Sequence, residues 1–378
     1  MGKGGGITGF TTDFSALVRQ NILEIEPYIP GKPIEEVEKE IGPREWAKLA
    51  SNENVLGPSP KAVEAMRAAL GQVHFYPDGS FLRLRAALAG RLGVPMEAII
   101  CGDGSDEVLK LLAEAFLHEG EEAVLPTPSF VTYRYVVQLM GAKALEVPLK
   151  DGAMNLEGMA AAVNPKTKLI VLCNPNNPTG GIVSREKLRS FLAGLPTGVL
   201  VVCDEAYFEY ADDPDYPDGV DLVREGFPCL VTRTFSKIYG LAGLRIGYGV
   251  GNPDLVRCLY QVKQAFPVNL LAQEAAIAAL EDVEHLEASR RLNREGKEYL
   301  YGELNRLGLA FQRTQANFIL VEVNRDGQEV FRGLLAEGMI VRPTHAFGLP
   351  KSIRVTIGTA EQNRRFMAAL EKVLAFGG

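Results

Sequence analysis

The sequence predicts an α/β fold in which a large domain, built as a mostly parallel sheet between two layers of helices, is joined to a smaller α/β domain. Two observations carry this prediction. Short apolar runs rich in Val, Ile and Leu alternate with segments of helical periodicity, which is typical of strand–helix–strand crossovers in a buried parallel sheet. The length of 378 residues accommodates a large domain and a companion, since domains average about 150 residues.

The first 47 residues are expected to form an arm rather than a domain. Residues 1–14 are rich in glycine, and an amphipathic segment over 14–22 favours a short helix. A proline-rich segment at 27–33 and a charged helix from Ile34 are expected next. We expect this arm to be partly disordered and to pack with the small domain or with a partner subunit.

The large domain is expected over residues 48–275. Its strands are predicted at the apolar runs 98–101, 123–125, 168–173, 199–203, 229–235 and 244–250. Helical periodicity between these runs predicts helices at 105–117, 130–140 and 184–195. Long helices over about 253–306 lead into the small domain, expected over 276–378, with strands at 318–323, 339–342 and 353–358 and helices from Gly327 and Ala360.

The composition excludes several classes of protein. The chain has 40 Lys and Arg against 47 Asp and Glu, a net charge of −7, so it has no basic excess to neutralise a nucleic acid. No apolar run approaches the roughly 20 residues that cross a bilayer, and the N-terminus lacks the apolar stretch of a secretory signal. We therefore expect no nucleic-acid or membrane partner and a cytoplasmic location.

The cysteines and histidines predict neither disulfides nor a metal site. The five Cys form no CxxC pair and mostly lie in strand-like apolar runs, so buried free thiols in a reducing compartment are expected. The four His are scattered without ligand spacing, so no metal is expected.

The first polar cluster follows the strand predicted at 98–101. The segment GDGSDE (102–107) opens a helix there, and backbone N–H groups of Gly104, Ser105 and Asp106 would point out of the helix N-terminus, where a phosphate is favoured. An ordinary helix cap is the alternative interpretation.

The next two clusters also follow predicted strands, where open α/β sheets bind ligands. In the segment 126–133, either Phe130 or Tyr133 could cover a flat ring, although core packing would explain both. The segment NPNNPTG (174–180) predicts a turn that presents Asn side chains above the sheet, and its density of Asn exceeds what a turn requires.

Two further clusters complete the set. Asp204 and Tyr207 follow the strand at 199–203, and a buried Asp needs a cationic partner, such as a protonated ring nitrogen. The segment 234–245 then brings together the hydroxyls of Thr234 and Ser236, the amine of Lys237 and the guanidinium of Arg245. One lysine for a Schiff base, one acid, an aromatic ring, Asn and Tyr donors, and a phosphate cradle together match pyridoxal 5′-phosphate.

These motifs resemble the fold-type I aminotransferases of class I/II, and within them the histidinol-phosphate aminotransferase family. The resemblance runs from about Tyr28 to the C-terminus. It rests on the segments 28–33, 51–54, 76–79, 102–107, 174–180, 204–207, 234–249, 316–319 and 342–359. Val55 departs from the family, which often has Pro there, and the glycine-rich residues 1–9 have no counterpart.

The resemblance implies catalytic roles for three residues. Lys237 would hold pyridoxal 5′-phosphate as a Schiff base and then serve as the acid and base for proton transfer. Asp204 would keep the pyridine nitrogen protonated, and Tyr207 would bind the phenolate oxygen together with Asn177. Phe130 would cover the ring face.

The resemblance also implies binding roles. The cofactor phosphate would be held by Gly104, Ser105, Asp106, Thr234, Ser236 and Arg245. Tyr76 would reach that phosphate from a partner subunit, which implies a homodimer. Arg354 would bind the substrate's acidic group, Arg342 and Tyr28 would hold a distal phosphate, and Asn54 would lie near the amine. A surface role before a proline turn is the alternative for Arg342.

The function expected from this resemblance is a ping-pong transamination between a small-molecule amino donor and a keto-acid acceptor. It would interconvert L-histidinol phosphate plus 2-oxoglutarate and imidazole-acetol phosphate plus L-glutamate, in histidine biosynthesis. An aromatic amino acid aminotransferase and a cofactor-dependent phospho-amino-acid decarboxylase are alternatives. A non-catalytic regulator would normally need a DNA-binding appendage, and the retained Lys237 argues against it.

Overall fold

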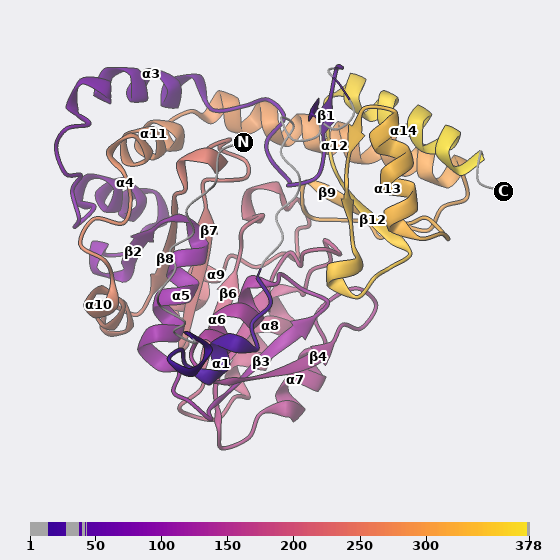
Figure 1. Ribbon diagram of the computed structural model, residues 1–378. Helices are drawn as coiled ribbons and strands as arrows, with labels where there is room; N and C mark the ends of the chain where they lie inside the picture. The colour runs from indigo at the N-terminus through magenta and orange to yellow at the C-terminus, as the bar shows by residue number, and fades with distance from the viewer. Residues whose placement is uncertain (1–13, 28–37, 40–41, 43, 376–378) are drawn as a thin grey trace, which may run out of the picture.

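The computed structural model describes residues 14–27, 38–39, 42 and 44–375, which form a large lobe around one sheet and a smaller C-terminal lobe (Figure 1). The sheet of the large lobe has seven strands in the order β2 (Ile99–Gly102), β8 (Gly247–Gly251), β7 (Cys229–Thr234), β6 (Leu200–Asp204), β5 (Thr167–Cys173), β3 (Glu122–Thr127) and β4 (Lys143–Pro148). Every strand pair is parallel except those of β8, which runs antiparallel to both neighbours. The predicted mostly parallel sheet is confirmed.

The central strands are buried on both faces, which explains their continuous apolar runs. Ile170 and Leu172 of β5 lie in one core, while Leu169 and Val171 lie in the other, as the alternation of side chains along a strand requires. The first core is covered by α4 (Leu82–Leu92), α8 (Arg185–Ala193), α9 (Gly219–Arg224) and α11 (Leu270–Leu280). The second is covered by α5 (Gly104–Phe116), α6 (Thr132–Leu139) and α10 (Pro253–Val262).

Sequence periodicity did not predict the edge strand β4. Its side chains are mostly exposed or half-buried, because β4 pairs with β3 alone and α7 (Leu156–Ala162) covers only part of it. An edge strand of this kind has charged residues such as Lys143 and Glu146 in place of an apolar run. Helix α3 (Pro60–Ala69), which packs on α11, was also not predicted.

The C-terminal lobe has its own sheet and core. Strands β11 (Arg342–Pro343), β12 (Ser352–Thr356) and β9 (Phe318–Glu322) form an antiparallel sheet in that order. Helices α12 (Val283–Arg306), α13 (Gly327–Ala336) and α14 (Ala360–Ala375) pack against it. Strand β1 (Ala47–Lys48) pairs with β10 (Met339–Ile340), so the chain just before the large lobe belongs to the C-terminal lobe.

The expected domain boundary at 275/276 falls inside α11. Ala275 and Ala276 are fully buried in the first core of the large lobe. Helix α12 runs from the α11 side into the C-terminal lobe (Figure 1), with Leu286 in the first core and Leu300 in the C-terminal core. We therefore propose that the domains divide within α12.

The N-terminal segment forms shorter helices than expected. In place of one helix over 14–22, η1 (Phe14–Ala16) and α1 (Gln20–Leu23) are separate. The side-chain amide of Asn21 donates to the carbonyls of Gln138 and Leu139 at the end of α6, which ties α1 to the large lobe. The proline-rich segment and most of the helix expected from Ile34 lie outside the described residues.

The five cysteines are free thiols, and four of them are buried. Among the described residues, no group of His, Cys, Asp and Glu side chains is arranged to hold a metal ion. In the same part of the chain, no helix is both long and apolar enough to cross a membrane.

Candidate active site

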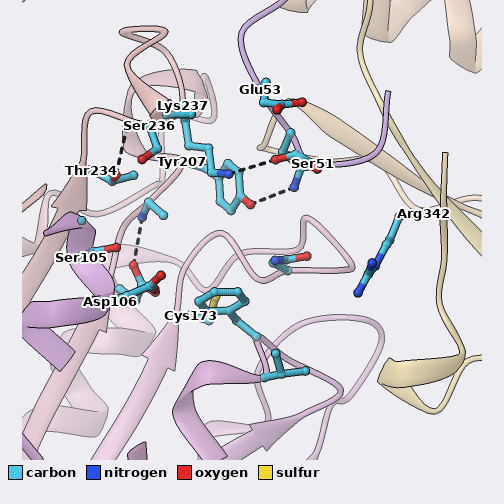
Figure 2. Close-up of a pocket in the computed structure, with 18 of the residues that line it drawn as sticks. Ser51, Glu53, Ser105, Asp106, Cys173, Tyr207, Thr234, Ser236, Lys237 and Arg342 are labelled. Atoms are coloured by element: carbon cyan, nitrogen blue, oxygen red, sulfur yellow. Dashed lines mark hydrogen bonds between the residues drawn. The ribbon is translucent and has the colours of Figure 1, made fainter. Parts of the chain in front are cut away.

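A pocket of about 280 Å³ opens at the carboxyl ends of the central strands, between the large lobe and the sheet of the C-terminal lobe (Figure 2). The structure brings thirteen of the predicted site residues to its wall. They are Gly104, Ser105, Asp106, Phe130, Asn177, Asp204, Tyr207, Thr234, Ser236, Lys237, Arg245, Arg342 and Arg354.

One end of the pocket combines a helix N-terminus with hydroxyls and a guanidinium. Helix α5 begins at Gly104, whose φ of +72° is in the left-handed region that favours glycine. A Cβ atom there would lie 2.6 Å from Arg245 Nη2, so glycine also allows the guanidinium to approach the helix end. Arg245 lies 3.6 Å from the Asp106 carboxylate and is nearly half exposed, which leaves it accessible to an anion.

The Asp204 carboxylate ends β6 in a buried position that faces the pocket. It accepts hydrogen bonds from the Tyr133 hydroxyl, the Thr232 hydroxyl and the Ala206 N–H. Burial raises the pKa of Asp204 to about 6, although the three donors act in the opposite direction. Because these donors are all neutral, a cationic group in the pocket would be a favourable partner.

Lys237 projects into the pocket from the loop after β7. Its Nζ donates to the Ser51 carbonyl oxygen at 3.2 Å and lies 5.7 Å from the centre of the Tyr207 ring. Burial, followed by the positive charge of Arg354, lowers the pKa of Lys237 to about 8. A sizeable fraction of this amine is therefore neutral and nucleophilic near pH 8.

We expect the lowered pKa of Lys237 to be visible in its reactivity. In cofactor-free protein, its rate of modification by trinitrobenzenesulfonate should be half-maximal near pH 8, whereas an ordinary lysine reaches that point only near pH ~10.4. Peptide mapping at successive times identifies which lysine is modified first. The Lys237→Ala variant should lack this rapidly modified amine. A half-maximal rate above pH ~10 would contradict the assignment.

The C-terminal lobe places two arginines on the pocket. Arg354 of β12 is buried and donates to Asn177 Oδ1 at 2.5 Å and to the Ala50 carbonyl at 2.6 Å, and its guanidinium lies over the Phe318 ring. Arg342 of β11 enters from the side opposite Ser105 and Asp106 (Figure 2). The two residues are paired across β11 and β12, so both reach the same cavity.

The structure places two predicted site residues elsewhere. Asn54 does not line this pocket, because its amide donates to the Ile238 carbonyl and to the Ser289 hydroxyl. Tyr76 is 82% exposed and stacks on Phe266, outside the pocket of its own chain. Tyr28 lies outside the described residues.

Comparison with known proteins agrees with this geometry. The profile of the family described as "Aminotransferase class I and II" matches residues 44–370. The chain belongs to the class I and II aminotransferases.

Several aminotransferases resemble the chain over nearly its whole length. The histidinol-phosphate aminotransferase of Moorella thermoacetica is 51% identical, with 94% of this chain and 93% of the relative covered. That of Symbiobacterium thermophilum is 49% identical, with 95% and 99% covered. The crystal structure of the histidinol-phosphate aminotransferase of Sinorhizobium meliloti, in complex with pyridoxal-5′-phosphate, has a TM-score of 0.89 at 28% identity and covers 99% of this chain and 100% of its own.

Sequence reasoning misses the site contacts of two residues of this aminotransferase, Asn52 and Tyr133. Asn52 lines the pocket and donates its amide to the Tyr207 hydroxyl at 2.9 Å. It lies in the SNEN motif (51–54), for which the resemblance implies a role of Asn54 alone. The sequence offers Tyr133 as an alternative to Phe130 for covering a ring, whereas in the structure its hydroxyl donates to Asp204 and its ring meets Phe130 edge-on.

Proposed function

We propose that this aminotransferase uses pyridoxal 5′-phosphate to exchange an amino group between L-histidinol phosphate and 2-oxoglutarate, with imidazole-acetol phosphate and L-glutamate as products. The observation that carries the proposal is the convergence of Lys237, Asp204 and two arginines on one pocket. The relatives at about half identity with this chain are named for histidinol phosphate, which supports the choice of substrate.

The residues of the pocket fit this cofactor. Its phosphate would bind at the N-terminus of α5, where a side chain at Gly104 would collide with Arg245, together with Ser105, Asp106, Thr234 and Ser236. Asp204, buried among neutral donors, would hold the protonated ring nitrogen. Phe130 would cover the ring, and Asn177 and Tyr207 would bind its phenolate oxygen.

When bound, the cofactor supplies an electron sink for the bond that breaks next to the amino group. Lys237 would bind the cofactor's aldehyde covalently with loss of water. Once the amine of the substrate has displaced it, Lys237 would carry the transferred proton on Nζ, for which a pKa of about 8 is suited near neutral pH. Asp204 would keep a negative charge beside the ring nitrogen. Asn52 would orient the Tyr207 hydroxyl, to which it donates.

The two arginines would select the substrates. Arg354 can present a planar fork to the carboxylate of glutamate, because such a guanidinium binds carboxylates in a bidentate manner. Arg342 lies across the pocket from the proposed cofactor-phosphate site (Figure 2), where the phosphate of histidinol phosphate would extend. We propose that Tyr28 contributes to the same distal site, and we assign Asn54 to holding the loop beside Lys237 rather than to the amine.

The replacement Arg342→Ala is expected to lower the efficiency with L-histidinol phosphate by roughly 10- to 100-fold, the value of a charge-assisted contact. The efficiency with L-phenylalanine should be unchanged, because it has no phosphate. Single half-reactions without keto acid, followed by the absorbance of the bound cofactor, give both values. Arg332→Ala, an exposed arginine of α13, is the matched control. An unchanged ratio between the two substrates would remove Arg342 from phosphate binding.

The same half-reactions of the unaltered protein test the proposed function. Rapid conversion by L-histidinol phosphate but not by L-phenylalanine supports it. Phe130 and Phe347 line the pocket and favour, as a second candidate, an aromatic amino acid aminotransferase, for which conversion by L-phenylalanine would be equal or better. Carbon dioxide release without a keto acid would instead indicate a decarboxylase.

We also propose a homodimer in which Tyr76 completes the partner's pocket. Tyr76 and Phe266 form an exposed stacked pair, and Val73 and Phe75 beside Tyr76 are also more than half exposed. An apolar surface of this kind suits a subunit interface, and a tyrosine on it can reach across. A cytoplasmic location agrees with the five free thiols and with a biosynthetic role.

A further inference from the structure

Tyr133 connects helix α6 to the acid at the end of β6. Its hydroxyl oxygen lies 2.5 Å from Asp204 Oδ2, and its side chain is 1% exposed. The ring meets Phe130 edge-on, with centroids 5.7 Å apart and planes at 84°. The tyrosine therefore lies within the core beside the pocket, with its polar atom directed at the carboxylate.

The other oxygen of Asp204 is held from different elements. Oδ1 accepts from the Thr232 hydroxyl of β7 at 3.1 Å and from the Ala206 N–H at 3.2 Å. Because each carboxylate oxygen has its own donor, rotation of the carboxylate would break a hydrogen bond on either side. Burial raises the pKa of Tyr133 well above its ordinary value, so this hydroxyl keeps its proton and remains a donor.

We propose that Tyr133 is a positioning residue that keeps Asp204 ionised and aimed at the ring nitrogen of the cofactor. The inference rests on the proposed function. A carboxylate that accepts a hydrogen bond from a buried hydroxyl is favoured over its protonated form, and a fixed orientation lowers the cost of binding a cation. Phe at this position would preserve the ring packing and remove only the donor.

Other titratable groups around Asp204 do not replace Tyr133. Burial raises the pKa of Cys173 on β5 and of Tyr207 to about 12, so both are neutral near pH 7. Asp106 at the start of α5 raises the pKa of Asp204 through its negative charge. Among the effects that lower the pKa of Asp204, the hydrogen bond from Tyr133 is the largest, ahead of that from Thr232.

The test is the affinity of the cofactor-free protein for pyridoxal 5′-phosphate, measured by equilibrium dialysis between about pH 5.5 and about pH 8.5. This interval includes the second ionisation of a phosphate and the raised pKa of the Asp204 carboxyl. We expect Tyr133→Phe to weaken binding about 10- to 100-fold near pH 7. The part of the acidic decline in affinity that reports protonation of Asp204 should move to higher pH by about one unit. The phosphate of the ligand and the Lys237 amine, whose pKa is about 8, titrate in every variant, so both cancel in the ratio of each variant to the unaltered protein.

Tyr301→Phe is the matched control, since it removes a buried tyrosine hydroxyl, bound to the Thr314 N–H, in the C-terminal lobe. It should leave cofactor affinity unchanged. If Tyr133→Phe does not fold, Thr232→Val removes the donor to the other oxygen and should move the acidic decline in the same direction. An unchanged decline in either folded variant would overturn the inference.

A double-mutant cycle separates positioning of Asp204 from a general structural role. In an Asp204→Asn background no carboxylate remains to be held, so adding Tyr133→Phe should have little further effect on cofactor affinity. An equal loss in both backgrounds would overturn the inference. If the unaltered protein does not bind the cofactor, the proposed function fails; if it binds and Tyr133→Phe binds equally well, only the inference fails.

Discussion

Lys237→Ala is expected to abolish amino-group transfer, with a loss of at least about 10⁴-fold in turnover, because it would remove both the proposed covalent anchor and the group proposed to move the proton. The lysine is half-buried, and desolvation of its amine together with the charge of Arg354 lowers its pKa to a value suited to proton transfer. Among the described residues that line the pocket, Lys237 is the one lysine, so none of them offers a second amine to replace it.

The measurement for Lys237→Ala has two parts. Keto-acid formation with both substrates gives the loss in turnover. Borohydride reduction of the cofactor-loaded protein, followed by peptide mass spectrometry, should locate the cofactor on the peptide that contains residue 237 in the unaltered protein and nowhere in the variant. Lys263→Ala, a lysine outside the pocket, is the control and should retain activity. Substantial turnover by Lys237→Ala would reject the mechanism.

Arg354→Ala should cause the second largest loss. We expect kcat/KM for glutamate to fall by a factor on the order of 10² to 10³, since removal of one partner from a buried charged contact costs about 2–5 kcal/mol. The variant also leaves the Asn177 side chain and the Ala50 carbonyl without their guanidinium donor. Arg354→Lys should recover only part of the loss, because an ammonium cannot form the planar fork.

A second readout distinguishes loss of substrate binding from general damage. The charge of Arg354 contributes to the lowered pKa of Lys237, so in Arg354→Ala that pKa should rise above its value of about 8. The pH dependence of Lys237 modification measures this shift directly. Arg325→Ala, which removes an arginine paired with Glu329 in the same lobe, should change neither quantity. An unchanged kcat/KM for glutamate together with an unchanged pKa of Lys237 would contradict the role of Arg354.

The fold class could be predicted because its signals are local. Apolar runs such as 168–173 correspond to strands buried on both faces, and these are the strands at the centre of the sheet. The edge strand β4 carried no such signal, because an edge strand needs little apolar surface. The boundary that we propose within α12 also has no signal in the sequence, since one continuous helix passes from one core to the other.

The candidate site was predictable to the extent that its residues follow strand ends. Asp204 ends β6, and Asn177 and Lys237 follow the neighbouring strands β5 and β7; the carboxyl ends of parallel strands meet at one edge of the sheet. The motif at 51–54 shows the limit of this reasoning. Asn52 has a φ of +58°, so the side-chain alternation of an extended segment does not apply there, and Asn52 rather than Asn54 reaches the pocket.

The sequence by itself determined the mostly parallel sheet, the kinds of polar side chain that follow its strands, and the family. Each of these depends on short segments of adjacent residues. Only the tertiary structure decided which of these groups contact one another. Tyr133 meets Asp204 across 71 positions, and Arg354 meets Asn177 across 177. Such contacts depend on how helices and lobes pack, and the packing that aims a carboxylate or an arginine into the pocket has no local signature in the chain.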